Sequence, residues 1–157
     1  MSQKVFISGS ISIKNLPAEV CRSMDRIMDQ GMRILVGDAR GVDSLVQQYC
    51  LSRGYFDVTI YTISDPPRNI ASERFGVRKI DVPDSLKNRR NRQAFKDRAM
   101  TEASDFSLVV WDGKSKGSYA NIARALEQGK KVKVYLVPEE RFLEPGELTG
   151  ILDGAKH

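Results

Sequence analysis

Short apolar segments alternate with amphipathic ones along most of the chain, and this alternation constrains the fold more than any other feature. Continuous apolar runs predict buried strands at 4–8, 33–37, 58–62, 106–111 and 132–137. Between these runs, apolar residues recur three and four positions apart, which predicts helices that begin near Asn15, Val42, Asn91 and Ser118. Strands that are apolar on both faces are typical of a parallel sheet covered by helices on each side.

This order of elements predicts one α/β domain over residues 1–157, a Rossmann-like doubly wound fold with a mostly parallel sheet and helices on both faces. Two segments interrupt the rhythm. Residues 63–88 contain three prolines and no clean period, so we expect a long loop excursion with one short strand at 77–82. Residues 138–157 form a C-terminal tail that contains Pro138 and Pro145, and we expect a short helix or irregular packing there.

The composition favours a soluble cytoplasmic protein that uses no metal. No apolar run approaches the ~20 residues of a membrane span, and the first residues, MSQKVFISGS, lack a signal-peptide core. Cys21 and Cys50 have no metal-ligand spacing, and the single histidine is His157. We therefore expect a cytoplasmic location, no membrane, no metal site and no resident cofactor. A homo-oligomer remains open.

Three glycine-containing loops follow predicted strands and precede predicted helices. In a doubly wound sheet such loops meet at one edge, where helix N-termini favour anions. The sequence thus predicts a binding site for a phosphate-bearing ligand. Its candidate residues are Gly9 and Ser10 in the first loop, Gly37, Asp38, Arg40, Gly41 and Asp43 in the second, and Asp112, Gly113, Gly117 and Ser118 in the third.

The third loop, WDGKSKGS at 111–118, contains the GKS ending of a phosphate-binding P-loop. The full pattern requires a glycine where this chain has Leu108, inside the predicted strand, so the P-loop interpretation fails. The first loop likewise lacks the GxGxxG dinucleotide pattern. Two interpretations remain open: phosphate binding through backbone N–H groups and the Ser118 hydroxyl, or an ordinary turn in which Ser118 caps the next helix.

The second loop, GDARGVD at 37–43, also has two interpretations. Asp38 and Asp43 could accept hydrogen bonds from ribose hydroxyls or a base edge, while Arg40 clamps a phosphate. Alternatively, Asp43 caps the following helix and Arg40 is solvated.

Basic residues are concentrated in one segment of a chain whose net charge is +5. Residues 87–98, KNRRNRQAFKDR, hold six of the 25 basic residues and one acidic residue. Such a run is either a solvated helix face or a contact for phosphate or nucleic acid.

The order strand-GDARGVD-helix, then KDRAM, then strand-WDGKSKGS-helix resembles the SLOG superfamily of Rossmann-like proteins. That superfamily includes the LOG-type phosphoribohydrolases and the DprA/Smf DNA-binding proteins. The likeness extends over about residues 33–137 plus Gly9-Ser10, and is greatest to a YspA-like bacterial branch with a GxARGxD motif. The resemblance implies a site for a nucleotide or nucleotide-derived ligand. It would be lined on one side by Gly9, Ser10, Gly37, Arg40, Gly41 and Asp43, and on the other by Arg98, Gly113, Gly117 and Ser118.

The chain departs from the family pattern at two informative positions. LOG-type hydrolases use a PGGxGTxxE loop, and aligning Gly117-Ser118 with its Gly-Thr places Asn121 at the glutamate position. An amide cannot act as a carboxylate base. The branch's first loop often continues with arginine after Gly-Ser, whereas this chain has Ile11.

Three functions follow as expectations. The first is binding of a nucleotide-derived small molecule, as a sensor or effector. The second is an N-glycosidase or phosphoribohydrolase that uses Asp38, Asp43 or Asp112 in place of the missing glutamate. The third is DprA-like DNA binding through residues 87–98.

Overall fold

The computed structural model describes residues 3–155 and contains one seven-stranded sheet with the order β4-β3-β2-β1-β5-β6-β7. Every neighbouring pair of strands is parallel except β6 and β7. The strands are β1 (Lys4–Gly9), β2 (Arg33–Val36), β3 (Val58–Thr62), β4 (Gly76–Lys79), β5 (Phe106–Trp111), β6 (Lys131–Leu136) and β7 (Arg141–Phe142). The helices are α1 (Ala18–Asp29), α2 (Val42–Ser52), α3 (Arg89–Ala103), α4 (Lys116–Glu127) and α5 (Pro145–Ala155), with the 3-10 turn η1 (Val137–Glu139) after β6.

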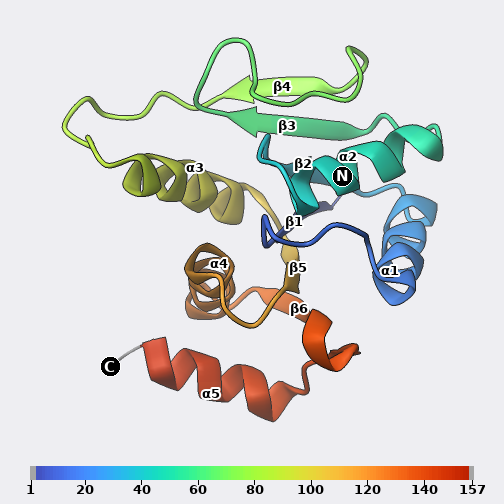
Figure 1. Cartoon of the computed structure of the whole chain (residues 1–157), viewed down its shortest axis with the longest axis vertical. Coiled ribbons are helices and arrows are strands. Elements are labelled where there is room, and N and C mark those ends of the chain that lie inside the picture. Colours follow the sequence, from blue (N-terminus) through green and yellow to red (C-terminus); the bar gives the residue numbers. More distant parts are fainter. Residues whose placement is uncertain (1–2, 156–157) are drawn as a thin grey trace.

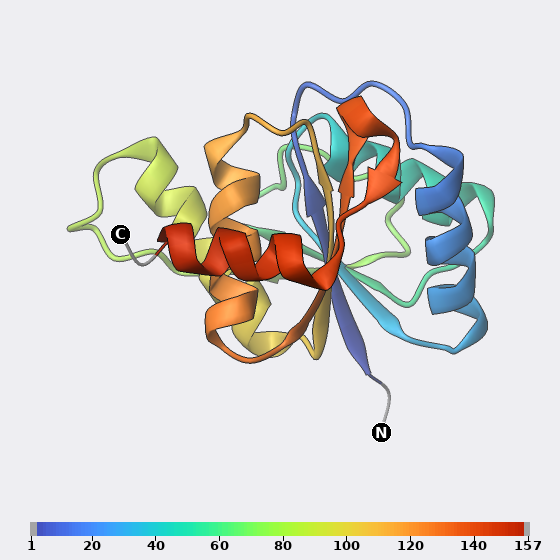
Figure 2. The same cartoon turned by 90° about the horizontal axis from the view of Figure 1, so that it is seen from below.

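Helices cover both faces of the sheet, which confirms the expected Rossmann-like doubly wound fold. Helices α1 and α2 lie on one side, and α3 and α4 lie on the other (Figure 1). The view from below shows the same layers, with α5 packed along the outside of α4 (Figure 2). None of the helices in residues 3–155 is long and apolar enough to cross a membrane.

Alternation along the strands divides the core between the two faces. In β1, Val5 and Ile7 belong to the large cluster under α1 and α2, whereas Phe6 packs with Met100 of α3. Ser8 follows Phe6 at the same period and therefore points toward the layer of α3 and α4. The core under α3 is small, and this leaves room on that face of β1.

The segment boundaries differ from the sequence expectations in several places. The short strand of the excursion is β4 at Gly76–Lys79 rather than 77–82, and it forms the exposed edge of the sheet. Helix α3 begins two residues before Asn91, because the Asn88 side chain accepts hydrogen bonds from the backbone N–H groups of Arg90 and Asn91. The tail contains a helix, α5, which is one of the two expected outcomes, and in addition the short strand β7.

The fourth predicted helix also begins earlier, and this bears on one of the two interpretations of its loop. Helix α4 begins at Lys116 with Ser115 at the N-cap, so Ser118 lies in the first turn. The idea that Ser118 caps this helix is therefore wrong. In the sheet, β1 lies between β2 and β5, so the strand order reverses direction at β1. The carboxyl ends of β1 and β5 thus form the topological switch point, where doubly wound folds bind ligands.

Candidate functional site

A cavity of about 630 Å³ lies between α3 and α4 at the carboxyl ends of the central strands. Its wall combines residues of β1, the loop after β2, α3 and the start of α4. The structure brings six of the sequence-predicted site residues together in this wall: Gly9, Ser10, Gly37, Asp43, Gly117 and Ser118. The loops that follow three different strands therefore share one site.

Three serines meet where β1 faces the start of α4. The Ser10 hydroxyl lies 3.0 Å from the Ser115 hydroxyl and 3.4 Å from that of Ser118. In the described residues, no oxygen accepts a hydrogen bond from the backbone N–H groups of residues 116–118. The dipole of the 12-residue helix α4 adds to the positive potential of these free donors. The start of α4 can therefore receive an anion.

The loop before α4 is held by Asp112. Its carboxylate accepts hydrogen bonds of 2.8 Å from the backbone N–H groups of Lys114 and Ser115, and one of 2.7 Å from the Ser12 hydroxyl. Burial would raise the pKa of Asp112, but these hydrogen bonds outweigh it and lower the pKa to about 2. Asp112 and Gly113 shape the loop but do not line the cavity.

The floor of the cavity combines apolar side chains with one unpartnered hydroxyl. Phe6 and Met100 line the cavity and are almost fully buried. Ser8 lies beside them and is 6% exposed, and its Oγ has no hydrogen-bond partner among residues 3–155. Buried hydroxyls are normally paired, so this atom marks a position where a ligand or an ordered water would complete the site.

Lys96 contributes a buried positive charge to the same wall. It is 3% exposed, and its Nζ lies 3.9 Å from both Asp38 Oδ1 and Asp97 Oδ1. Both distances are longer than a hydrogen bond, so these contacts are ion pairs only. Lys96 Nζ makes no hydrogen bond within residues 3–155. The ammonium therefore retains its donors for a third group in the cavity.

Asp43 lies close to this ammonium and is partly protonated near neutral pH. Its Oδ2 accepts a hydrogen bond of 3.1 Å from the Ala39 backbone N–H. Burial raises the pKa of Asp43 to about 7, although Lys96 and the Ala39 N–H favour the charged form. A Cβ at position 37 would lie 2.5 Å from Asp43 Oδ2 and 3.0 Å from Lys96 Nζ. Only glycine at position 37 leaves room for this arrangement.

Asp38 is used differently from Asp43. It is 1% exposed and accepts hydrogen bonds from the Thr62 hydroxyl at 2.7 Å and from Arg68 Nη2 at 2.7 Å. Burial would raise the pKa of Asp38, but Arg68 and Thr62 together lower it. Asp38 thus anchors the long excursion to the carboxyl ends of β2 and β3, and it faces a second, neighbouring hollow with Arg40.

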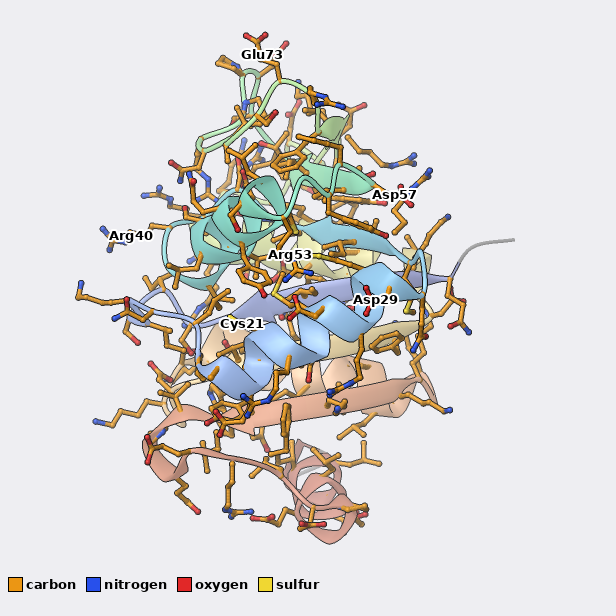
Figure 3. The ribbon with its side chains drawn as sticks, turned by 90° about the vertical axis from the view of Figure 1, so that its right-hand side faces the viewer. Cys21, Asp29, Arg40, Arg53, Asp57 and Glu73 are labelled. Carbon is orange, nitrogen blue, oxygen red and sulfur yellow. The ribbon has the colours of Figure 1, made fainter. Side chains whose placement is uncertain are left out.

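Neither of the two predicted arginines lines the cavity. Arg40 is exposed, and Figure 3 shows its side chain directed away from the molecule. Arg98 is exposed on α3 and lines neither hollow. Gly41 supports the site from behind, since its φ of 76° and a Cβ position 2.4 Å from Ile11 Cα require glycine.

The basic residues at 87–98 differ in burial and in what they contact. Lys96 is buried in the cavity wall, Arg90 lines the rim, and Arg92 donates a hydrogen bond of 2.9 Å to the Leu86 carbonyl. Arg98 is exposed and lines neither hollow. The basic residues of this segment therefore occupy different environments.

Several cavity residues were not among the sequence-predicted candidates: Ser8, Arg68, Arg90, Lys96, Asp97, Asn121 and Arg124. Ser8 is the last residue of β1 that faces the layer of α3 and α4. A polar residue at that strand position is a sequence signal that could have identified it. Asn121 lies in the wall, where its Oδ1 accepts a hydrogen bond of 2.7 Å from Arg124. Lys96 carried no signal of its own, because a lysine in a polar helix normally points to solvent.

No protein-family model, curated protein or solved structure matches the chain. In residues 3–155, no group of three histidine, cysteine, aspartate or glutamate side chains is placed to hold a metal ion. The geometry of the cavity is therefore the basis for the functional proposal.

Proposed function

We propose that this protein binds a nucleotide or nucleotide-derived small molecule in the cavity between α3 and α4, as a sensor or effector. One observation carries the proposal: several polar groups of the wall have no hydrogen-bond partner within residues 3–155. These are the Ser8 hydroxyl, the Lys96 ammonium and the N–H groups at the start of α4. A ligand with oxygen acceptors would satisfy all of them at once.

The phosphate of such a ligand fits the start of α4. Free backbone N–H groups, the hydroxyls of Ser115 and Ser118, and the helix dipole all favour an anion there. Gly117 leaves the backbone open, because a Cβ at this position would meet no atom within 4 Å. A phosphate can therefore approach the N–H groups closely.

The remainder of a nucleotide fits the rest of the cavity. Phe6 and Met100 close the floor beneath a sugar or base, while Asp43 and Lys96 offer an acceptor and a donor for ribose hydroxyls. The volume of about 630 Å³ lies within the ~300–1,000 Å³ of small-molecule sites. The free thiols of Cys21 and Cys50 suit a reducing compartment, and we place this function in the cytoplasm.

Thermal unfolding against a panel of ligands tests the proposal. The panel contains nucleoside monophosphates, cyclic nucleotides, NAD and ADP-ribose. A ligand at 100 times its dissociation constant adds ~2.7 kcal/mol to the free energy of unfolding. For a chain of this size that raises the Tm by roughly 5–10 °C.

The variant Gly117→Ala ties a positive result to the cavity. Its methyl group is added at a residue that lines the cavity and meets no protein atom within 4 Å, so we expect normal folding and a lost Tm shift. Gly150→Ala in α5 is the matched control, since its Cβ also meets no atom within 4 Å and it is remote from the cavity. Silence across the panel, or equal shifts in both variants, would refute the proposal.

Glycosidic bond cleavage is the second candidate, and the state of Asp43 favours it. A carboxyl group whose pKa is about 7 can act as a general acid or base at neutral pH. Asp43 lines the cavity, whereas Asp38 and Asp112 are engaged in hydrogen bonds to the protein. Release of free base from the ligand found in the panel, lost in Asp43→Asn, would establish this activity. Intact ligand after long incubation would exclude it.

A further inference from the structure

A second hollow of about 640 Å³ adjoins the cavity and is lined by four arginines. These are Arg40, Arg68, Arg89 and Arg90. The two spaces share part of their wall, including Ile11, Arg68 and Arg90. One elongated ligand can therefore occupy both.

The second hollow carries unneutralised positive charge. Its single carboxylate is Asp38, which already pairs with Arg68 at 2.7 Å. In the described residues 3–155, Arg40, Arg89 and Arg90 form no ion pair. Guanidinium groups of this kind bind phosphate with paired, charge-assisted hydrogen bonds.

The position of two of these arginines is unfavourable without an anion. Arg89 and Arg90 lie in the first turn of α3, where the helix dipole already presents positive potential. That turn contains no acidic residue. A bound phosphate would reverse this repulsion into attraction, and local departures from favourable charge placement are typical of functional sites.

An apolar residue separates the two anion-binding ends. Ile11 lines both spaces and is 54% exposed, which is unusual for a large apolar side chain beside a polar site. Its backbone is held by Gly41, whose Cα approaches it so closely that a Cβ would lie 2.4 Å from Ile11 Cα. Ile11 thus provides a fixed apolar contact for the middle of a ligand.

We propose that the ligand of this protein carries two phosphate groups separated by an organic spacer. One phosphate binds at the start of α4, the spacer contacts Ile11, and the second phosphate binds to Arg40 and Arg89 in the second hollow. This inference rests on the proposed function and adds the ligand class: a nucleoside bisphosphate or a molecule with the same spacing of charges.

Isothermal titration calorimetry with three matched probe series tests this inference. The probes are the four common nucleoside 5′-monophosphates, their 3′,5′-bisphosphates and their 5′-diphosphates, at one ionic strength. For a nucleoside that binds, we expect the 3′,5′-bisphosphate to bind roughly 10- to 100-fold more tightly than the 5′-monophosphate. The double variant R40Q/R89Q should lose this gain and keep its affinity for the monophosphate.

The control is R22Q/R78Q, which removes the same charge from two exposed arginines that line neither space. It should retain the gain. Equal affinity for mono- and bisphosphates, or a gain that survives in R40Q/R89Q, would overturn the inference and leave the proposed function standing. If only the 5′-diphosphates bind more tightly than the monophosphates, the two phosphates need no organic spacer and that part of the inference is refuted. If none of the twelve probes binds, the inference fails, and the proposed function fails with it only if cyclic nucleotides, NAD and ADP-ribose are also silent in the thermal unfolding panel.

Discussion

Replacing Ser8 by alanine should make the ligand-free protein more stable and its ligand complex weaker. Ser8 Oγ is buried without a hydrogen-bond partner. A buried polar group left unsatisfied costs about 1–3 kcal/mol, and alanine removes that group. We therefore expect the free energy of unfolding to rise by about 1 kcal/mol, which for a chain of this size raises the Tm by roughly 2–4 °C.

The same substitution should weaken ligand binding. A hydrogen bond from Ser8 to a phosphate or sugar oxygen would contribute about 1–3 kcal/mol, so its loss lowers affinity by roughly 5- to 150-fold. Urea unfolding measures the first effect, and calorimetry with the strongest ligand of the panel measures the second. Opposite signs of the two changes are the signature of a hydroxyl kept for the ligand.

Ser104→Ala is the matched control, because this serine is 3% exposed but has a partner. Its hydroxyl donates a hydrogen bond of 3.0 Å to the Thr101 carbonyl. Its loss should lower the free energy of unfolding by about 0.5–1.5 kcal/mol and leave binding unchanged. If Ser8→Ala destabilises the protein as Ser104→Ala does, the Ser8 hydroxyl is already satisfied and our reasoning is refuted.

Two further predictions concern the second loop. Burial raises the pKa of Asp43 to about 7, whereas an unfolded aspartate titrates near ~3.9, so the folded state binds the additional proton between these values. The free energy of unfolding should therefore fall as pH rises from ~4 to ~7, and Asp43→Asn should remove this part of the slope in urea titrations; an unchanged slope would show that Asp43 titrates normally. Gly41→Ala should destabilise the fold by more than ~2 kcal/mol, because it combines a positive φ with a clash against Ile11. Gly129→Ala has a similar φ of 69° and open space, so it isolates the cost of the backbone conformation, and equal losses in both variants would contradict the predicted clash.

Much of the fold could be predicted because its signals are local. The strand at 106–111 is one continuous apolar run, and Gly31 and Gly129 end their helices with φ near 70°. The boundaries at α3 and α4 could not be predicted as well, since the local sequence does not show whether a side chain accepts the first N–H groups. Asn88 does so for α3, whereas no side chain does so for α4.

The sequence by itself determined the alternating order of strands and helices, and with it the convergence of three glycine loops at one edge of a parallel sheet. Periodicity and turn chemistry are properties of neighbouring residues, so they can be recognised without the fold. Only the tertiary structure decided which polar groups share the cavity. Lys96 and Arg98 are two positions apart on the same helix, yet one is buried beside Asp38 and the other is exposed. That difference arises from how α3 packs over β1 and against α4, and no local pattern in the chain encodes it.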